Sequence, residues 1–172
     1  MAYINGSEIL FSARLTGVGY AVEDLKGVIE GSIAELEIPE GTEIIRQSLF
    51  SGCGSLTRIT IPGSVTDIGG SAFSGCGNLT EVIFSEGLLS IGLGAFSGCK
   101  LTSVEIPSTV TKIAKLAFNG TTITKVVFKG KPNSIGNTAF NGASGVIECP
   151  WKEGEVADAP WGASNATILY TG

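Results

Sequence analysis

The stretch Ala72–Val82, AFSGCGNLTEV, contains five residues that recur along the chain. AFSGC stands again at 95–99, and LFSGC stands at 49–53. The phenylalanines belong to a series with steps of 23, 23, 22 and 22 residues, made up of Phe50, Phe73, Phe96, Phe118 and Phe140. A fixed period of about 20 to 50 residues is the signature of a repeat architecture. The sequence therefore predicts similar structural units stacked along one axis.

Glycine and aliphatic residues recur in the same register. The clearest columns are Gly52, Gly75, Gly98, Gly120 and Gly142; Leu36, Ile59, Val82, Val104 and Val126; and Ile45, Ile68, Ile91, Ile113 and Ile135. Within one unit, Ile59 and Ile61 alternate with Thr60, which is the pattern of a half-buried strand. Pro62 then ends the strand because it has no N–H for a ladder. The segment 65–78 has apolar residues at spacings of three to four, which predicts turns with a short helical or 3-10 piece.

The unit 56–76 reads L-x-x-I-x-I-P-x-x-V-x-x-I-x-x-x-A-F-x-x-C and resembles the BspA-like leucine-rich repeat family. The resemblance implies an α/β leucine-rich-repeat solenoid with about five to six repeats. The expected solenoid is a right-handed coil with a parallel β-sheet on its concave face and short 3-10 or helical turns on its convex side. Stacked units of this kind share one continuous core that no single unit could bury alone.

The two ends of the chain lie outside the period. We predict a β-rich N-terminal cap over 1–32, with strands around Ile9–Phe11 and Ala13–Leu15, repeats over 33–150, and a C-terminal cap over 151–172. Trp151 and Trp161 would cover the open end of the core, as the atypical terminal units of solenoids do. The alternative for these tryptophans is an aromatic binding site for a sugar or a protein.

Composition excludes several classes of function. The chain has 172 residues, no histidine and a net charge of −5. Without histidine, a Ser-His-Asp triad cannot form and the commonest metal ligand is missing. No basic patch indicates a nucleic acid partner, and no apolar run reaches the roughly 18 residues of a membrane span. We therefore expect no catalytic residues, no cofactor, no metal site and no membrane insertion.

Three cysteines share one repeat position, at Cys53, Cys76 and Cys99, and the next two units place Thr121 and Ala143 there. A position that accepts threonine or alanine requires a small residue rather than a thiol. Equivalent residues of neighbouring units would lie about 5 Å apart, which is close enough for one disulfide. We nevertheless expect all the cysteines, including Cys149, to be reduced core residues.

The outward positions of the predicted strands form the candidate binding face. Its residues are Glu35, Arg58, Thr60, Glu81, Ile83, Ser103, Glu105, Lys125 and Val127. Glu81 and Glu105 are carboxylates on adjacent strands, but a shallow solenoid face offers no obvious cleft for an enzyme. The alternation of charge from Glu35 to Glu81 is equally consistent with cross-strand ion pairs and with a ligand face.

Charge also divides along the axis of the repeats. Residues 33–86 carry a net charge of −5 and residues 87–148 a net charge of +4. This asymmetry could favour self-association or steer a partner.

The resemblance implies a non-enzymatic module that binds an unknown protein or glycan in adhesion or recognition at a bacterial cell surface. The alternative is a phage tail-associated or virion structural protein. The segment 4–15 is similar to the openings of prophage tail-region proteins, and the tryptophan-containing C-terminus is similar to segments in proteins of gut Firmicutes and their phages. No secretory signal is visible in the first residues. The expected location is the cell surface, the medium or a phage particle.

Overall fold

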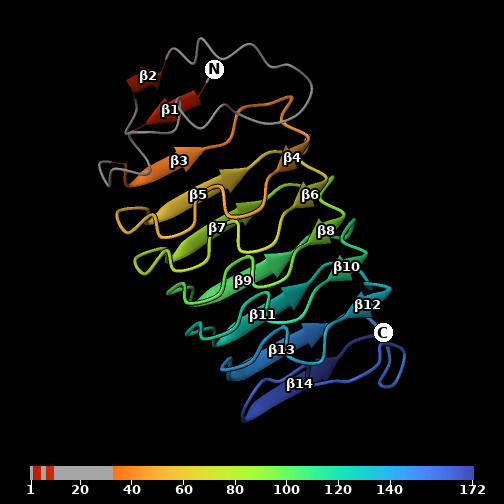
Figure 1. The fold of residues 1–172 in the computed structure, drawn as a ribbon. Coiled ribbons are helices and arrows are strands. Elements are labelled where there is room, and N and C mark those ends of the chain that lie inside the picture. The colour runs from red at the N-terminus through yellow and green to blue at the C-terminus, as the bar shows by residue number, and fades with distance from the viewer. Residues whose placement is uncertain (1, 5–6, 10–32) are drawn as a thin grey trace.

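Parallel strands from successive turns of the chain stack side by side (Figure 1). The computed structural model describes residues 2–4, 7–9 and 33–172. Strands of three to five residues form what we call the long-strand face. They are β3 (Glu35–Glu37), β5 (Arg58–Ile61), β7 (Glu81–Phe84), β9 (Ser103–Ile106), β11 (Lys125–Phe128), β13 (Gly145–Cys149) and β14 (Ala166–Tyr170). These strands confirm the predicted solenoid, which has about six turns.

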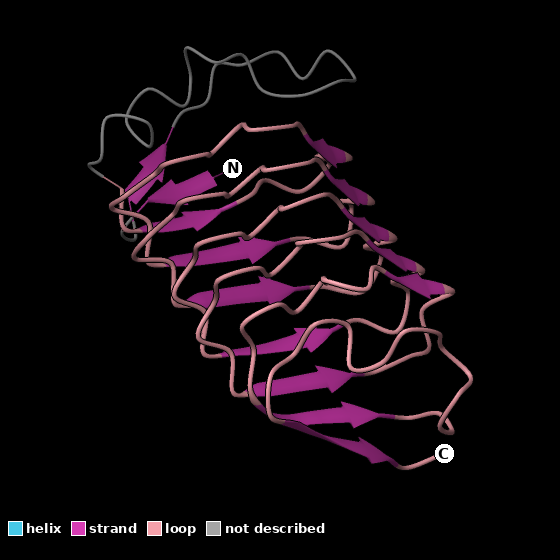
Figure 2. Cartoon of the chain, turned by 60° about the horizontal axis from the view of Figure 1, so that its bottom comes forward, coloured by secondary structure: helices cyan, strands magenta, loops and turns pink. Residues whose placement is uncertain are grey.

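A second parallel sheet lies on another side of the coil (Figure 2). Its two-residue strands are β4 (Ile44–Ile45), β6 (Asp67–Ile68), β8 (Ser90–Ile91), β10 (Lys112–Ile113) and β12 (Ser134–Ile135). Each of these strands ends in the isoleucine column found in the sequence, and those isoleucines are buried. The short-strand sheet runs unbroken from β4 to β12.

The α/β assignment with short helical or 3-10 turns is not confirmed, because residues 33–172 contain no helix. In the turn 69–76, three N–H groups donate to carbonyl oxygens three residues earlier. The N–H groups of Phe73 and Gly75 instead donate to Ala95 and Ser97 of the next turn of the solenoid, both at 2.8 Å. Gly75 also has a φ of 73°, outside the right-handed helical region. Hydrogen bonds that alternate between the turn and its neighbour therefore replace the expected helical piece.

The core is a stack of aromatic rings flanked by aliphatic columns. The phenylalanines at the repeat position are all fully buried, and consecutive rings are parallel to within 10° with centroids 5.0–5.4 Å apart. Offset-stacked rings at this separation contribute about 0.5–1.5 kcal/mol beyond the burial of their area. This stack explains why phenylalanine recurs at one position in five consecutive units.

Trp151 and Trp161 lie at the C-terminal end of this core. They are 3% and 0% exposed, and both rings pack edge-on against Phe128. The N–H of Phe140 donates to the carbonyl of Trp161, where the earlier phenylalanines donate to alanine. Trp161 thus takes the alanine position of one further turn, and its indole fills the end of the core. Since both indoles are buried, neither offers an open ring face to a ligand.

At the other end, β1 (Ala2–Ile4) and β2 (Ser7–Ile9) form an antiparallel pair, and β1 lies beside β3 (Figure 1). Ile9, in the first predicted strand, ends β2. The rest of the strands predicted over 9–15 lies outside the described residues. The predicted cap boundaries at 32 and 150 stay predictions.

Candidate binding face

The predicted binding residues occupy two columns on the long-strand face. The first column contains Glu35, Arg58 and Glu81 in register on β3, β5 and β7, then Ser103 and Lys125 in register on β9 and β11. The second contains Thr60 and Ile83 on β5 and β7, then Glu105 and Val127 on β9 and β11. Thr60, Ile83 and Val127 are half-buried and the others are exposed. The structure brings these side chains together on one face, and their binding role stays a prediction.

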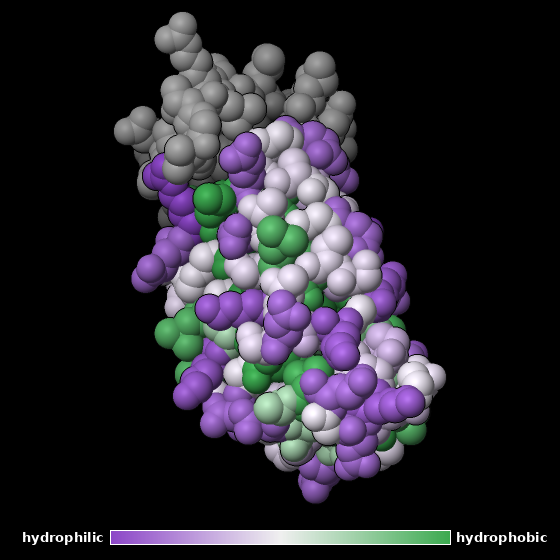
Figure 3. All heavy atoms as spheres, turned by 90° about the vertical axis from the view of Figure 1, so that its right-hand side faces the viewer, coloured by the Kyte–Doolittle hydropathy of each residue, from purple (hydrophilic) through white to green (hydrophobic). Residues whose placement is uncertain are grey.

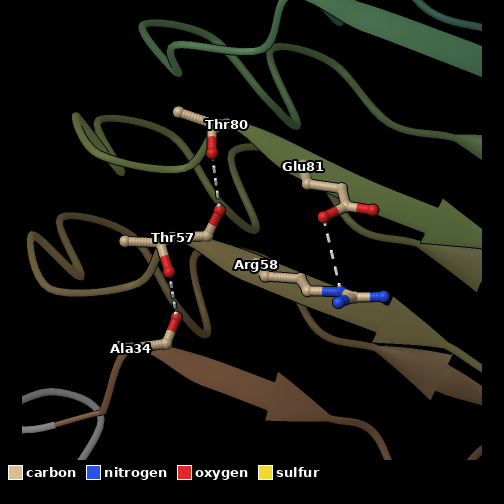
Figure 4. Close-up of polar contacts among 5 residues, drawn as sticks. All are labelled: Ala34, Thr57, Arg58, Thr80 and Glu81. Carbon is tan, nitrogen blue, oxygen red and sulfur yellow. Dashed lines mark hydrogen bonds and ion pairs between the residues drawn. The ribbon is translucent and has the colours of Figure 1, made fainter.

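Ion pairs connect several charged side chains of the face. Arg58 Nε lies 3.4 Å from Glu81 Oε2 on the adjacent strand (Figure 4). Lys129 Nζ lies 2.6 Å from Glu105 Oε2, and this hydrogen bond raises the pKa of Lys129. Cross-strand pairing, one of the two explanations for the alternating charges, is therefore realised at Arg58 and Glu81. Exposed pairs of this kind add little to the stability of the fold.

A ladder of threonine hydroxyls borders the long strands (Figure 4). Thr57 Oγ1 donates to the carbonyl of Ala34, and Thr80 Oγ1 donates to the carbonyl of Thr57. The backbone N–H of each threonine donates to the same carbonyl. Further along, Thr124 makes both bonds to Thr102. Each such carbonyl therefore ties two successive turns together.

The ladder is interrupted between β7 and β9. Among the described residues, neither Thr102 nor Ser103 donates its N–H to the carbonyl of Thr80, and β7 and β9 form no ladder pair. The long-strand sheet thus consists of two parts, β3-β5-β7 and β9-β11-β13-β14. The short-strand sheet still pairs β8 with β10 on the other side of the same turns. The break is confined to the candidate binding face.

One shortened turn explains the break. Two consecutive units connect the cysteine to the leucine through two residues, as in Cys76-Gly-Asn-Leu79, whereas the next connects Cys99 to Leu101 through Lys100 alone. In the longer version, the N–H of Leu79 donates to the carbonyl of Cys76 and closes a turn before the strand. Cys99-Lys-Leu101 is too short for this turn. Consequently, the start of β9 is displaced relative to β7, compared with the start that the longer turn would give.

A cleft of about 230 Å³ lies at the break. Its lining consists of Thr80, Glu81, Val82, Ile83, Phe84, Ser103, Val104 and Glu105. Phe84 is half-buried, although the residues at its repeat position on β5, β9 and β11 are at most 3% exposed. The face thus carries a small cleft at a place where the sequence indicated no obvious one for an enzyme. Four of the predicted face residues line the cleft. The change in repeat length from 23 to 22 residues was the signal in the sequence for the position of the cleft.

The cysteines are buried free thiols. Cys76 and Cys99 each donate a hydrogen bond from Sγ to a phenylalanine carbonyl of the preceding turn, at 3.0 and 3.2 Å. Thr121 at the same repeat position donates its hydroxyl to the carbonyl of Phe118 at 2.8 Å. A small side chain with a hydrogen-bond donor thus suits this position, and the cysteines face the core rather than a ligand.

The side of the molecule that carries the short strands is mixed in polarity. Apolar residues stand there in separate small groups among hydrophilic ones (Figure 3). Across the described part of the chain, no three acidic or cysteine side chains converge to hold a metal ion. Nor does that part contain a helix long and apolar enough to cross a membrane.

Parallel strands, repeated turns and an outward-facing polar sheet define the class of leucine-rich-repeat solenoids. The BspA-type leucine-rich repeat region matches residues 30–147 in six copies, so the chain belongs to that family. No curated protein sequence matches it.

Two solved structures share the fold. A leucine-rich cell surface protein from Faecalibacterium prausnitzii A2-165 is 28% identical over 81% of this chain, with a TM-score of 0.56. A leucine-rich-repeat protein from Eubacterium ventriosum ATCC 27560 is 20% identical over 80% of the chain, with a TM-score of 0.53. In each case the match covers 32% of the other chain, so this chain spans about a third of those proteins.

Proposed function

We propose that this chain is a non-enzymatic recognition module of a bacterial surface protein and that it binds a macromolecule through the long-strand face. The observation that supports this most is the face itself. Exposed charged groups and half-buried apolar groups lie there in register within each part of the long-strand sheet, with Ile83 on one part and Val127 on the other. A binding surface of this composition combines apolar anchors with a polar surround.

Two further observations support the proposal. The similar Faecalibacterium protein is described as a cell surface protein, and this chain belongs to the same repeat class. Glu81 and Glu105 are exposed and ion-paired. Glycoside hydrolases instead hold two carboxyl groups on either side of an enclosed glycosidic bond. A binding role therefore suits these carboxylates better than catalysis.

The face is tested by charge reversal. Glu81→Lys, Glu105→Lys and Lys125→Glu are combined in one variant, and the control combines Lys112→Glu with Lys115→Glu on the short-strand side. Fluorescently labelled proteins are applied to cultured epithelial cells and to immobilised matrix proteins. We expect the triple variant to lose about tenfold in binding and the control to retain it. Equal binding by the triple variant and the unmodified chain would exclude the long-strand face.

Location is tested by fractionating the native culture and probing each fraction with an antibody to this chain. Recovery in the cell wall or the medium supports the surface role. Recovery in purified phage particles after induction would contradict it and support the virion alternative instead.

A further inference from the structure

We infer that the cleft between β7 and β9 binds one neutral, hydroxyl-bearing ring, namely a single sugar residue of a glycan. The inference deepens the proposed function and rests on it, since it names the ligand class that one part of the long-strand face recognises.

The walls of the cleft present an unused acceptor and an unused donor. On β5 and β7, the N–H groups of Arg58 and Glu81 donate to the carbonyls of Ala34 and Thr57. Ser103, which holds their position on β9, makes no such bond to Thr80, although the structure describes both residues. The Ser103 N–H can therefore donate to a ligand and the Thr80 carbonyl can accept from one, and a hydroxyl group does both.

An inserted peptide strand does not fit. Cα atoms of β7 and β9 approach within 8 Å of each other. Two strands with a third between them are about 9.5 Å apart, twice the normal spacing. The cleft therefore admits a small group entering from the surface, but no additional strand in the sheet.

The charges at the cleft favour a neutral ligand. Glu81 is paired with Arg58, and Glu105 is paired with Lys129. A cationic ligand would have to displace these basic side chains, and an anionic ligand would meet both carboxylates. A paired carboxylate still has acceptor sites for hydroxyl groups, because its two oxygens offer about four lone-pair positions. Neutral polyols therefore suit the paired carboxylates at the edge of the cleft better than ionic ligands do.

The size and the apolar wall point to one ring. The volume of about 230 Å³ lies below the roughly 300–1,000 Å³ of pockets that enclose drug-sized ligands. Ile83 and Phe84, both half-buried, line the cleft from successive positions of β7, and each offers an apolar contact to the C–H groups of a sugar ring. A second hollow of about 100 Å³ shares Phe84 and Glu105 with the first and is also lined by Glu86, Pro107 and Lys129. A group attached to the first ring can lie there.

The experiment follows backbone amide signals by NMR while sugars are added to the isotopically labelled chain. The probes are methyl glycosides of glucose, galactose, mannose and N-acetylglucosamine, with sialic acid and a lysine-rich peptide as charged comparisons. We expect at least one neutral glycoside to shift the amide signals of Thr80, Phe84 and Ser103. Larger shifts with the peptide or with sialic acid would overturn the inference. So would shifts spread evenly over the surface, or none at all.

Two variants and a control test the cleft itself. Glu105→Ala removes one rim carboxylate at an exposed position, and insertion of glycine after Cys99 restores the longer turn and brings β9 into register with β7. We expect both to weaken binding of the glycoside by about tenfold, whereas Lys112→Glu, on the short-strand side, changes it by less than about twofold. Unchanged binding by Glu105→Ala would overturn the inference even if the insertion variant failed to fold.

The two proposals can fail separately. If no sugar binds the cleft while the triple charge-reversal variant still loses cell binding, only the sugar inference is wrong. If a sugar binds the cleft but charge reversal leaves cell binding unchanged, the surface-recognition role is wrong. Only the inference that the cleft binds a sugar is then supported.

Discussion

Phe73 and Phe96 stack ring on ring, with centroids 5.0 Å apart and planes 10° from parallel. The pair lies at the centre of the phenylalanine stack, and Phe96 also packs on Phe118 and edge-on against Phe84 beside the cleft. The core and the candidate binding face are therefore in direct contact.

Phe96→Ala should destabilise the protein strongly. The ring is fully buried, and its removal leaves a cavity between two neighbouring rings. Replacements of this kind cost about 3–5 kcal/mol in the free energy of unfolding. Denaturant unfolding followed by circular dichroism measures the change. Leu93→Ala serves as the control, since Leu93 is 57% exposed and its loss should stay within about 0.5 kcal/mol.

Thr80→Val should lower stability, whereas Thr102→Val should not. Thr80 donates its hydroxyl to the carbonyl of Thr57, and the net contribution of such a bond is about 0.5–1.5 kcal/mol. Thr102 holds the same repeat position across the break from β7. Urea midpoints of the two variants provide the comparison. Equal losses would show that the ladder is intact between Thr80 and Thr102.

Glu86 should make the stability of the folded protein more sensitive to acid. Its carboxylate accepts hydrogen bonds from Ser108 Oγ, from the Ser108 N–H and from the Thr109 N–H, and these bonds lower the pKa of Glu86 below its ordinary value of 4.5. A lowered pKa in the folded state gives stability that is present above about pH 4.5 and is lost as the pH falls through the folded value. Glu86→Gln should therefore flatten the decline of the urea midpoint below that pH. An unchanged slope would contradict the contribution of Glu86.

The cysteines should be reduced and unreactive in the folded protein. Burial raises the pKa of Cys149 to about 12, so little thiolate exists near pH 8. We expect iodoacetamide to label none of the four cysteines in buffer and all of them in denaturant, as intact mass shows. A non-reducing mass lighter by two hydrogens would reveal a disulfide and contradict this expectation.

Most of the fold could be predicted from the sequence, because the period of the apolar residues indicates which positions are buried. Ile59 and Ile61 alternate with Thr60, and that alternation alone places a strand with one buried face. The prediction of a short helical segment was wrong, and the spacing of the apolar residues does not reveal the reason. Apolar residues such as Phe73 recur at near-helical intervals, but their N–H groups bond to the next turn.

The candidate site was only partly predictable. The repeat placed Glu81 and Glu105 on one face, because both hold outward positions of their strands, where Glu81 aligns with Arg58 and Glu105 with Val127. The cleft depends on the missing residue between Cys99 and Leu101, and its effect on pairing requires the geometry of the turn. The pairing of Lys129 with Glu105 was also missed, because Lys129 lies just beyond its strand.

The break between β7 and β9 is the central claim, because the cleft and its ligand depend on it. Amide hydrogen exchange of the unliganded chain tests it most directly. The amides of Glu81 and Val146, which donate to the preceding turn at 3.2 and 2.9 Å, provide the reference. We predict that the Ser103 amide exchanges at least about tenfold faster than both. Protection of Ser103 equal to that of Glu81 and Val146 would show a continuous sheet and contradict the account.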